Sequence, residues 1–263
     1  MIDKYLNQII CGDCLEVMQG MPDKCVDLVV TSPPYDNLRD YKGFTFDFEG
    51  IAQQLSRIIK DGGVIVWVVA DATVNGSETG TSFRQALYFK DVCGLNLHDT
   101  MIYAKNNPTP LSHNRYEQQF EYMFVFSKDS PACFNPIKSK TLTSGKEYSW
   151  KDTNDHGRNS AKRARLEKTV TKSSKNRFNI FHYNLSGYKY TNSAPFPEQL
   201  AKDHIISWSN PGDIVLDCFS GSGTTAKMAK LTNRQYISLE ISEEYCEIAR
   251  QRLAKTYYNE EMF

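Results

Sequence analysis

The run Val64-Ile65-Val66-Trp67-Val68-Val69 is the feature that most constrains the fold of this chain. All six residues are apolar and five are β-branched, a pattern typical of a strand that is buried on both faces. Such a strand needs helices packed on both sides of its sheet. Other apolar runs recur along the chain, with amphipathic segments between them. We therefore expect an α/β fold, with a doubly wound and mostly parallel sheet.

The expected strands and helices alternate along most of the chain. The expected strands are residues 6–10, 26–30, 64–69, 99–103, 121–126, 213–217 and 236–240. The expected helices are residues 15–18, 51–60, 83–89, 198–209, 226–230 and 243–253, with Asp61-Gly62-Gly63 ending the second. Their expected inner faces include Leu200, His204, Ile205 and Trp208 in the fourth helix, and Tyr245, Ile248 and Leu253 in the last.

The composition is that of a globular protein. At 263 residues and 40% hydrophobic content, one main domain with an insertion is the simplest expectation. No apolar stretch is long enough to span a bilayer, and the polar start Met1–Lys4 is not a signal peptide, so we expect a cytoplasmic protein.

The seven cysteines are expected to be free thiols. Cys11 and Cys14 form a C-x-x-C pair, but no second pair at ligand spacing accompanies them, so we expect no metal or redox role.

Charge is balanced overall but unevenly distributed. Residues 138–190 hold thirteen basic and four acidic side chains, a net charge of +9, and the remainder of the chain carries −9. Aromatic residues such as Trp150 and Tyr190 are interspersed, which fits a nucleic-acid contact segment. A solvated loop with a small aromatic core is the alternative. We accordingly expect residues 1–127 and 191–263 to form the main domain, and residues 128–190 to be a basic recognition insertion.

A stiff turn, Ser32-Pro33-Pro34-Tyr35, follows the expected strand 26–30 and Thr31. The two prolines fix φ and remove two amide donors, so neither a strand nor a helix can continue through them. Rigid carbonyl acceptors beside an aromatic ring suit a planar ligand that carries an exposed amino group. A loop cap with a core tyrosine is the alternative for this turn taken alone.

A glycine-containing loop, Cys218–Thr225, joins the expected strand 213–217 to a helix. Its glycines allow close approach of a ligand, and the helix start offers free amides. The third glycine of a dinucleotide fingerprint and the Gly-Lys of a P-loop are both absent, so neither NAD nor ATP is favoured.

Acidic residues lie at the ends of two other expected strands. Glu240 stands at the spacing of a ribose-binding carboxylate, and Asp13 follows the first strand.

In this order and spacing, the motifs resemble those of S-adenosylmethionine-dependent DNA amino-methyltransferases. The resemblance is to the circularly permuted beta group, in which an S/D-P-P-Y motif precedes the cofactor loop. Thr31–Tyr35 matches the catalytic motif and Asp217–Thr225 the cofactor motif. Gly12-Asp13 matches the G-D element, and Ala194–Leu200 the proline-containing segment ahead of the cofactor loop. Residues 5–127 and 190–255 are covered.

The resemblance implies a fold, a reaction and a set of roles: a Rossmann-like methyltransferase domain that uses S-adenosylmethionine and acts on double-stranded DNA with the target base flipped out. The implied catalytic residues are Ser32 and Pro33 as acceptors for the exocyclic amine, Pro34, and Tyr35 as a stacking ring. The implied cofactor residues are Phe219, Gly221, Gly223, Thr224 and Thr225 on the methionine portion, Asp217 near its amino group, Glu240 on the ribose and Asp13 on the adenine amine.

The target base and the partners are less closely defined by the resemblance. A serine at the first motif position usually accompanies cytosine-N4 methylation, so Ser32 favours cytosine, with adenine N6 as the alternative. The chain has no Pro-Cys pair, so the cysteine-nucleophile route of carbon-5 cytosine methylation is not expected. An RNA or protein-amide methyltransferase and a non-catalytic nucleic-acid-binding module are further alternatives. A homodimer and a cognate restriction endonuclease are the candidate protein partners.

Overall fold

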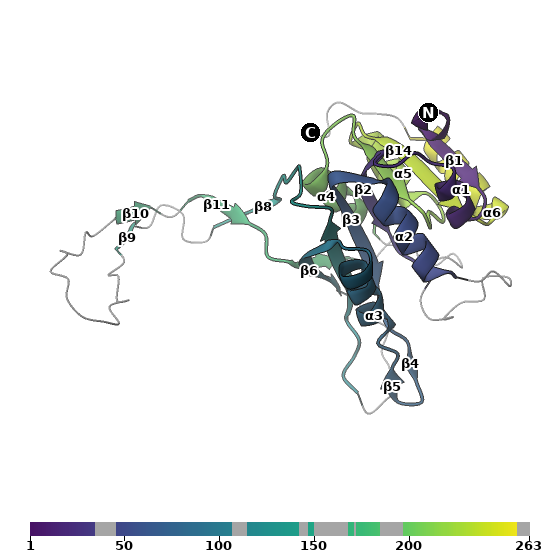
Figure 1. The fold of residues 1–263 in the computed structure, drawn as a ribbon. Coiled ribbons are helices and arrows are strands. Elements are labelled where there is room, and N and C mark those ends of the chain that lie inside the picture. Colours follow the sequence, from purple (N-terminus) through teal and green to yellow (C-terminus); the bar gives the residue numbers. More distant parts are fainter. Residues whose placement is uncertain are drawn as a thin grey trace. The chain divides into compact units, whose positions relative to one another are not determined.

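The chain forms two compact units (Figure 1). A computed structural model describes residues 1–34, 46–106, 115–141, 147–149, 168–170, 172–184 and 197–256. The larger unit comprises Met1–Asn135 and Asn179–Phe263, and the smaller comprises Pro136–Phe178.

An eight-stranded sheet is the centre of the larger unit. In spatial order its strands are β1 (Gln8–Cys11), β14 (Gln235–Glu240), β13 (Ile214–Asp217), β2 (Val26–Thr31), β3 (Ile59–Val69), β7 (Phe120–Ser127), β6 (Asn96–Lys105) and β12 (Ile180–Tyr183). The first five are parallel to one another, β7 is antiparallel to both of its neighbours, and β12 is parallel to β6. The prediction of an α/β fold with a mostly parallel sheet is confirmed.

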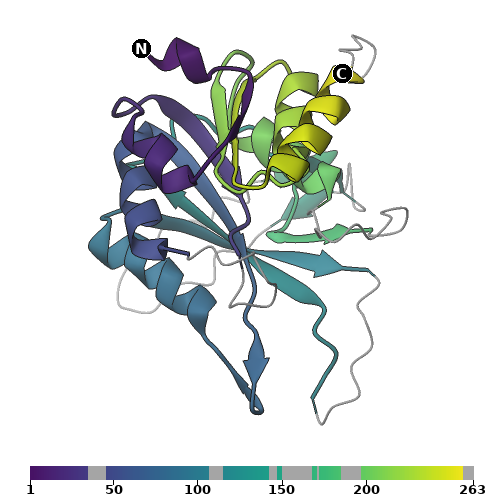
Figure 2. The same cartoon turned by 90° about the vertical axis from the view of Figure 1, so that its right-hand side faces the viewer.

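Helices cover both faces of this sheet (Figure 2). One face carries α1 (Cys14–Gln19), α2 (Phe48–Ile58), α3 (Thr81–Leu87) and a π-helical turn, η2 (Tyr88–Val92). The other carries α4 (Glu198–Trp208), α5 (Thr224–Leu231) and α6 (Glu243–Ala254). A 3-10 helix, η1 (Ile2–Tyr5), precedes β1, and β4 (Thr73–Val74) pairs with β5 (Ser77–Glu78). Within the described ranges, no helix has the length and apolar character needed to cross a membrane.

The core is built around β3, as its apolar run predicts. The side chains of residues 64–69 are each at most 1% exposed, so the strand is buried on both faces. The indole N–H of Trp67 donates to Oε1 of Gln85 at 2.9 Å, which satisfies a polar atom that burial would otherwise leave unpaired. The predicted inner face of α4 is also confirmed, since its four residues are buried: Leu200, His204, Ile205 and Trp208.

The boundary between α2 and β3 differs from the prediction of a helix over 51–60. The helix ends at Ile58 and the strand begins at Ile59, so residues 60–63 lie in the strand rather than in a helix-ending turn. The pairing of β2 with β3 shifts register here, and Gly62 adopts a φ of +76°. Such an irregularity depends on the partner strand, which the local sequence pattern does not contain.

The buried face of α6 also differs from the prediction. Of its three predicted apolar residues only Leu253 is buried, and Ile248 is 39% exposed. Cys246 and Ala249 are buried instead. A Cβ built at Gly223 would lie 2.9 Å from the Cβ of Ala249, so small side chains on α6 allow the helix to approach the glycine loop closely.

Two helices begin two residues earlier than predicted. The first residue of α3 is Thr81 and that of α5 is Thr224. At the start of α3, Asp71 accepts a hydrogen bond from the Ser82 amide at 2.9 Å. Because this capping residue lies eleven positions before the amide, the usual capping signals do not reveal it.

The smaller unit, in the part that the structure describes, contains two antiparallel strand pairs. β8 (Lys138–Lys140) pairs with β11 (Ser174–Asn176), and β9 (Glu147–Ser149) pairs with β10 (Lys168–Val170). The unit falls within the segment 128–190, whereas residues 128–135 and β12 belong to the larger unit.

Candidate active site

Four predicted motifs lie at the carboxyl ends of the strands of the sheet. They follow four neighbouring parallel strands, β1, β14, β13 and β2. Asp13 comes shortly after β1, Glu240 ends β14, Asp217 ends β13, and Ser32 follows β2. The carboxyl ends of parallel strands form the ligand crevice of an open α/β sheet. The backbone amide of Gly12 donates to the Glu240 carbonyl at 2.9 Å, which joins two segments at opposite ends of the chain.

Asp217 connects the strand before the Ser32–Pro34 turn with the glycine loop and its helix. Oδ1 accepts a hydrogen bond from Thr31 Oγ1 at 2.7 Å and another from the Phe219 amide at 3.1 Å. Oδ2 accepts one from Thr225 Oγ1 at 2.7 Å. Thr31 immediately precedes Ser32, so the carboxylate ties the catalytic turn to the loop.

The environment of Asp217 is almost closed to solvent. The residue is 2% exposed, and burial raises the pKa of its carboxyl group to about 6, although the hydrogen bonds from Thr225 and Thr31 act to lower it. Thr225 is only 1% exposed. The structure therefore places both residues, which were predicted to contact the cofactor, in the interior beneath the loop.

The loop itself provides open space at Gly221 and close packing at Gly223. Both have positive φ, +48° and +78°, a conformation that favours glycine. A Cβ at Gly221 would meet nothing within 4 Å, unlike the one at Gly223, which would strike α6. The buried hydroxyl of Ser220 has no hydrogen-bond partner within the described part of the chain. An approachable backbone and an unsatisfied hydroxyl fit a loop that receives a polar ligand.

Glu240 and Asp13 provide carboxylate acceptors beside this loop. Oε2 of Glu240 accepts from the Gly221 amide at 2.8 Å, and Oε1 accepts from the Ser242 amide at 2.9 Å. Each oxygen has a second lone pair with which to accept from a hydroxyl. Asp13 caps α1, with Oδ1 accepting from two amides of its first turn at 2.8 and 3.2 Å. This donor and acceptor set fits a ligand with ribose hydroxyls and an amino group.

The turn predicted to be catalytic leaves the sheet directly from β2. Pro33 is buried, and Ser32 and Pro34 are half-buried. Tyr35 lies outside the described residues, so its stacking role stays a prediction. On the other side of that gap, the ring of Phe46 packs against that of Phe219 with centroids 5.7 Å apart.

Arg252 and Glu198 support the loop, and the sequence did not reveal either of them. Arg252 Nη1 donates to the Ser222 carbonyl oxygen and to the Thr224 hydroxyl, both at 3.1 Å, and Nη2 donates to the Glu198 carboxylate. Lys227 Nζ donates to the same carboxylate at 2.7 Å. Partial burial acts to raise the pKa of Glu198, but the hydrogen bonds from Lys227 and Arg252 hold it below its ordinary value. The cluster joins three helices, so no local spacing marks it.

Comparisons of sequence place the chain among DNA methyltransferases. The model of a family described as DNA methylase matches residues 26–251. The orphan methyltransferase M.BamHII of Bacillus amyloliquefaciens is 50% identical over 248 residues, which cover 89% of this chain and 91% of that protein. The type II methyltransferase M.SmaI of Serratia marcescens is 27% identical, over 94% of this chain and 91% of that protein.

Solved structures share the fold. The PvuII DNA methyltransferase (cytosine-N4-specific) superposes with a TM-score of 0.68 at 20% identity, over 96% of this chain and 88% of that one. The M1.HpyAVI–SAM complex superposes with a TM-score of 0.63 at 22% identity, over 94% of this chain and 98% of that one. Since the family model spans most of the chain and M.BamHII is similar over nearly all of it, the chain belongs to the N6/N4 DNA methylase family.

Proposed function

We propose that this DNA methyltransferase transfers a methyl group from S-adenosylmethionine to the N4 amine of a cytosine flipped out of double-stranded DNA. One observation carries the proposal. The acceptors of the turn Ser32-Pro33 and the glycine loop stand at the ends of adjacent parallel strands, β2 and β13, joined through Asp217. An amine held by the turn is thus brought next to a donor held by the loop.

The methyl donor is S-adenosylmethionine, whose sulfonium supplies an electrophilic methyl group when it is bound. Glu240 accepts hydrogen bonds from its ribose hydroxyls, and Asp13 accepts one from its adenine amine. The loop holds the methionine portion through four residues: Phe219, Gly221, Gly223 and Thr224. We assign Asp217 and Thr225 to joining this loop to β2, because the Asp217 carboxylate accepts hydrogen bonds from the hydroxyls of Thr31 and Thr225.

The catalytic turn acts by positioning and polarising the amine. Ser32 Oγ and the Pro33 carbonyl oxygen accept hydrogen bonds from the exocyclic N–H groups, which favours an sp³-like nitrogen whose lone pair can attack in line. Pro34 fixes the backbone of the turn, and Tyr35 stacks on the flipped base. The serine at position 32 supports cytosine over adenine as the target, and the PvuII enzyme of the same fold is cytosine-N4-specific.

The smaller unit is proposed to contact DNA through its basic residues. Neutralising phosphates with lysine and arginine supplies affinity and register without base information. A homodimer and a cognate restriction endonuclease are the protein partners we propose, and M.SmaI is named as a type II methyltransferase. Sedimentation of the purified chain tests the first of these partners.

The product tests the proposed reaction directly. DNA of mixed sequence is incubated with the protein and S-adenosylmethionine, digested to nucleosides and analysed by mass spectrometry. We expect N4-methylcytosine. N6-methyladenine would contradict the base assignment while keeping the enzyme class, and no methylated amine at all would contradict the proposed function.

The variant Pro34→Ala provides the control for the site. It should lose methyl transfer and keep cofactor affinity, because the turn holds the base rather than the donor. A large loss of cofactor affinity in Pro34→Ala would show that the turn contributes to cofactor binding rather than to holding the base.

A further inference from the structure

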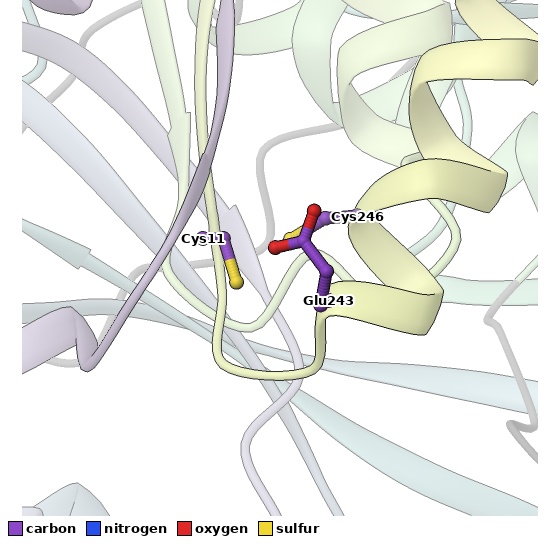
Figure 3. Close-up of side chains that lie close together, drawn as sticks. All are labelled: Cys11, Glu243 and Cys246. Atoms are coloured by element: carbon purple, nitrogen blue, oxygen red, sulfur yellow. The ribbon is translucent and has the colours of Figure 1, made fainter.

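Three side chains with metal-binding atoms meet where β1 ends and α6 begins (Figure 3). Sγ of Cys11, Sγ of Cys246 and a carboxylate oxygen of Glu243 all lie within 4.8 Å of one another. Cys11 is the last residue of β1, and the other two belong to the first turn of α6. Cys14, the sequence neighbour of Cys11 in the C-x-x-C pair, is buried in the hydrophobic core instead.

The spacing of these atoms is close to that of a tetrahedral site. With Zn–S near 2.3 Å and Zn–O near 2.1 Å, ligand atoms around zinc are roughly 3.5 Å apart. Cys11 and Glu243 are exposed, so small rotations of their side chains can close the difference. Cys246 is 0% exposed and is fixed on the helix, with Sγ donating to the Glu240 carbonyl oxygen at 3.4 Å. An ion that enters from solvent therefore meets an inner sulfur that is fixed in position and binds the ion as a thiolate once its proton is released to solvent.

Arg250 is the cation beside this cluster, and it orients the carboxylate. Its Nη1 lies 2.9 Å from Oε1 of Glu243, and its Nη2 donates to the Ile9 carbonyl oxygen at 3.3 Å. The second carboxylate oxygen of Glu243 can then bind an ion while the first is held by the guanidinium. Outer hydrogen bonds of this kind commonly orient carboxylates that bind metals. Glu247, whose Oε2 is 3.9 Å from Arg250, offsets part of its positive charge.

We propose that Cys11, Glu243 and Cys246 form a site for a thiophilic divalent cation, Zn²⁺ being the expected ion, with water as the fourth ligand. Two sulfur ligands select zinc over magnesium or calcium, which prefer oxygen. The ion would join β1 to α6 beside Glu240, since Cys11 is the register partner of Glu240 in the parallel pair of β1 with β14. The site lies outside the catalytic turn and glycine loop, and the methyl-transfer reaction does not require it.

Direct metal binding tests this site. Full-length protein freed of metal with a chelator is titrated with Zn²⁺ against a chromophoric competitor, and with Co²⁺ while thiolate-to-metal and tetrahedral absorption bands are recorded. We expect one equivalent of either ion. Cys11→Ser and Cys246→Ser should each weaken binding at least tenfold and reduce the intensity of the thiolate-to-metal bands, and Glu243→Gln should weaken binding less.

The controls separate loss of ligands from loss of fold. Cys93→Ser removes a partly exposed thiol outside the cluster and should bind like the unaltered protein. Cys11 is exposed, so its variant should keep the far-ultraviolet circular dichroism of the parent. Binding that is absent in the parent, or unchanged in Cys11→Ser, overturns the proposal.

A second measurement links the ion to the cofactor site, and it alone rests on the proposed function. Affinity for S-adenosylmethionine is measured by calorimetry with and without Zn²⁺. We expect severalfold tighter binding with the ion, because it would fix the backbone next to Glu240. Equal affinities for S-adenosylmethionine with and without Zn²⁺ would overturn the link between the ion and the cofactor site. The Zn²⁺ titration decides the metal site independently, so failure of the metal site and failure of the proposed function are distinguishable.

Discussion

At the scale of single residues, Asp217 shows how one buried charge sets the geometry of a site. Its carboxylate receives donors from β2, from the glycine loop and from α5. Leaving any of these donors unpaired in the interior would cost free energy, so the three elements are held in one arrangement. The same burial disfavours the ionised form of the carboxyl group, so the contribution of Asp217 to stability depends on pH.

The stability contribution of Asp217 should decrease as pH rises. The folded pKa of about 6 lies above the ordinary value of 3.8, so the folded state binds the proton more tightly than the unfolded chain does. This contribution is full below the unfolded pKa and is lost as pH rises through the folded one. Asp217→Asn removes it. Between about pH 5 and about pH 7.5, the unfolding free energy of the variant should gain about 1 kcal/mol relative to the parent.

Urea denaturation of both proteins at the two pH values measures this difference. An exposed acid such as Glu244, changed to glutamine, is the matched control and should show no comparable gain. A constant difference between Asp217→Asn and the parent across this range would contradict the buried ionisation.

Gly221 and Gly223 give a second prediction at this scale. Alanine at Gly223 combines a φ of +78° with a Cβ 2.9 Å from Ala249, so it should destabilise the protein by about 2 kcal/mol or more. Alanine at Gly221 meets open space and should cost about 1 kcal/mol of backbone strain. Yet Gly221→Ala should weaken cofactor binding at least tenfold, because its methyl group occupies the approach to the loop. Thermal unfolding and calorimetry together separate the two effects, and equal losses of stability would contradict the assignment.

At the scale of elements, the glycine loop depends on a helix that is distant in sequence. Arg252 of α6 bonds to two loop residues and is itself held by Glu198 of α4. We expect Arg252→Ala to raise the dissociation constant for S-adenosylmethionine about tenfold, or about 1.4 kcal/mol, while the rate at saturating cofactor changes little. Isothermal calorimetry and single-turnover rates measure the two quantities.

Gln251→Ala is the control for this prediction. Gln251 is the exposed neighbour of Arg252 and bonds to Glu247 rather than to the loop. Gln251→Ala should keep near-parental cofactor-free stability. An equal fall in affinity for the two would show that α6 acts on the loop only through its general packing.

The same scale shows what sequence reasoning could reach. Three features carry their signals within a few residues. The run at 64–69 is a buried strand, the Pro33-Pro34 turn follows the end of β2, and the glycine loop precedes α5. The hydrogen bond from Thr31 to Asp217 joins residues 186 positions apart, and the bond from Arg252 to Glu198 joins residues 54 positions apart. No local pattern encodes such pairings, and for the same reason the sequence did not predict the register shift between β2 and β3.

At the scale of the whole molecule, the charge is segregated between two compact units. β8 of the smaller unit exposes Lys138 and Lys140 on either side of Ser139, so the two lysines lie on one face of the strand. If this unit contacts phosphates, Lys138→Ala with Lys140→Ala should reduce the slope of log affinity against log salt by about 2, at unchanged cofactor affinity. Fluorescence anisotropy with a labelled duplex measures the slope.

Lys255→Ala provides the comparison for these lysines. It removes an exposed positive charge at the end of α6 in the larger unit. This variant should keep the parental salt slope. A double variant of Lys138 and Lys140 that also keeps it would exclude these lysines from the DNA contact.

The strand order also has a consequence for how the protein is made on the ribosome. β1 is synthesised long before β14, which is its neighbour in the sheet within the described part of the chain and ends at residue 240. The strand pair that brings Asp13 near Glu240 therefore cannot form until β14 has emerged, and the nascent chain carries β1 without this partner until then. A working methyltransferase would then first arise after β14 has emerged from the ribosome, rather than from an early domain that folds without it.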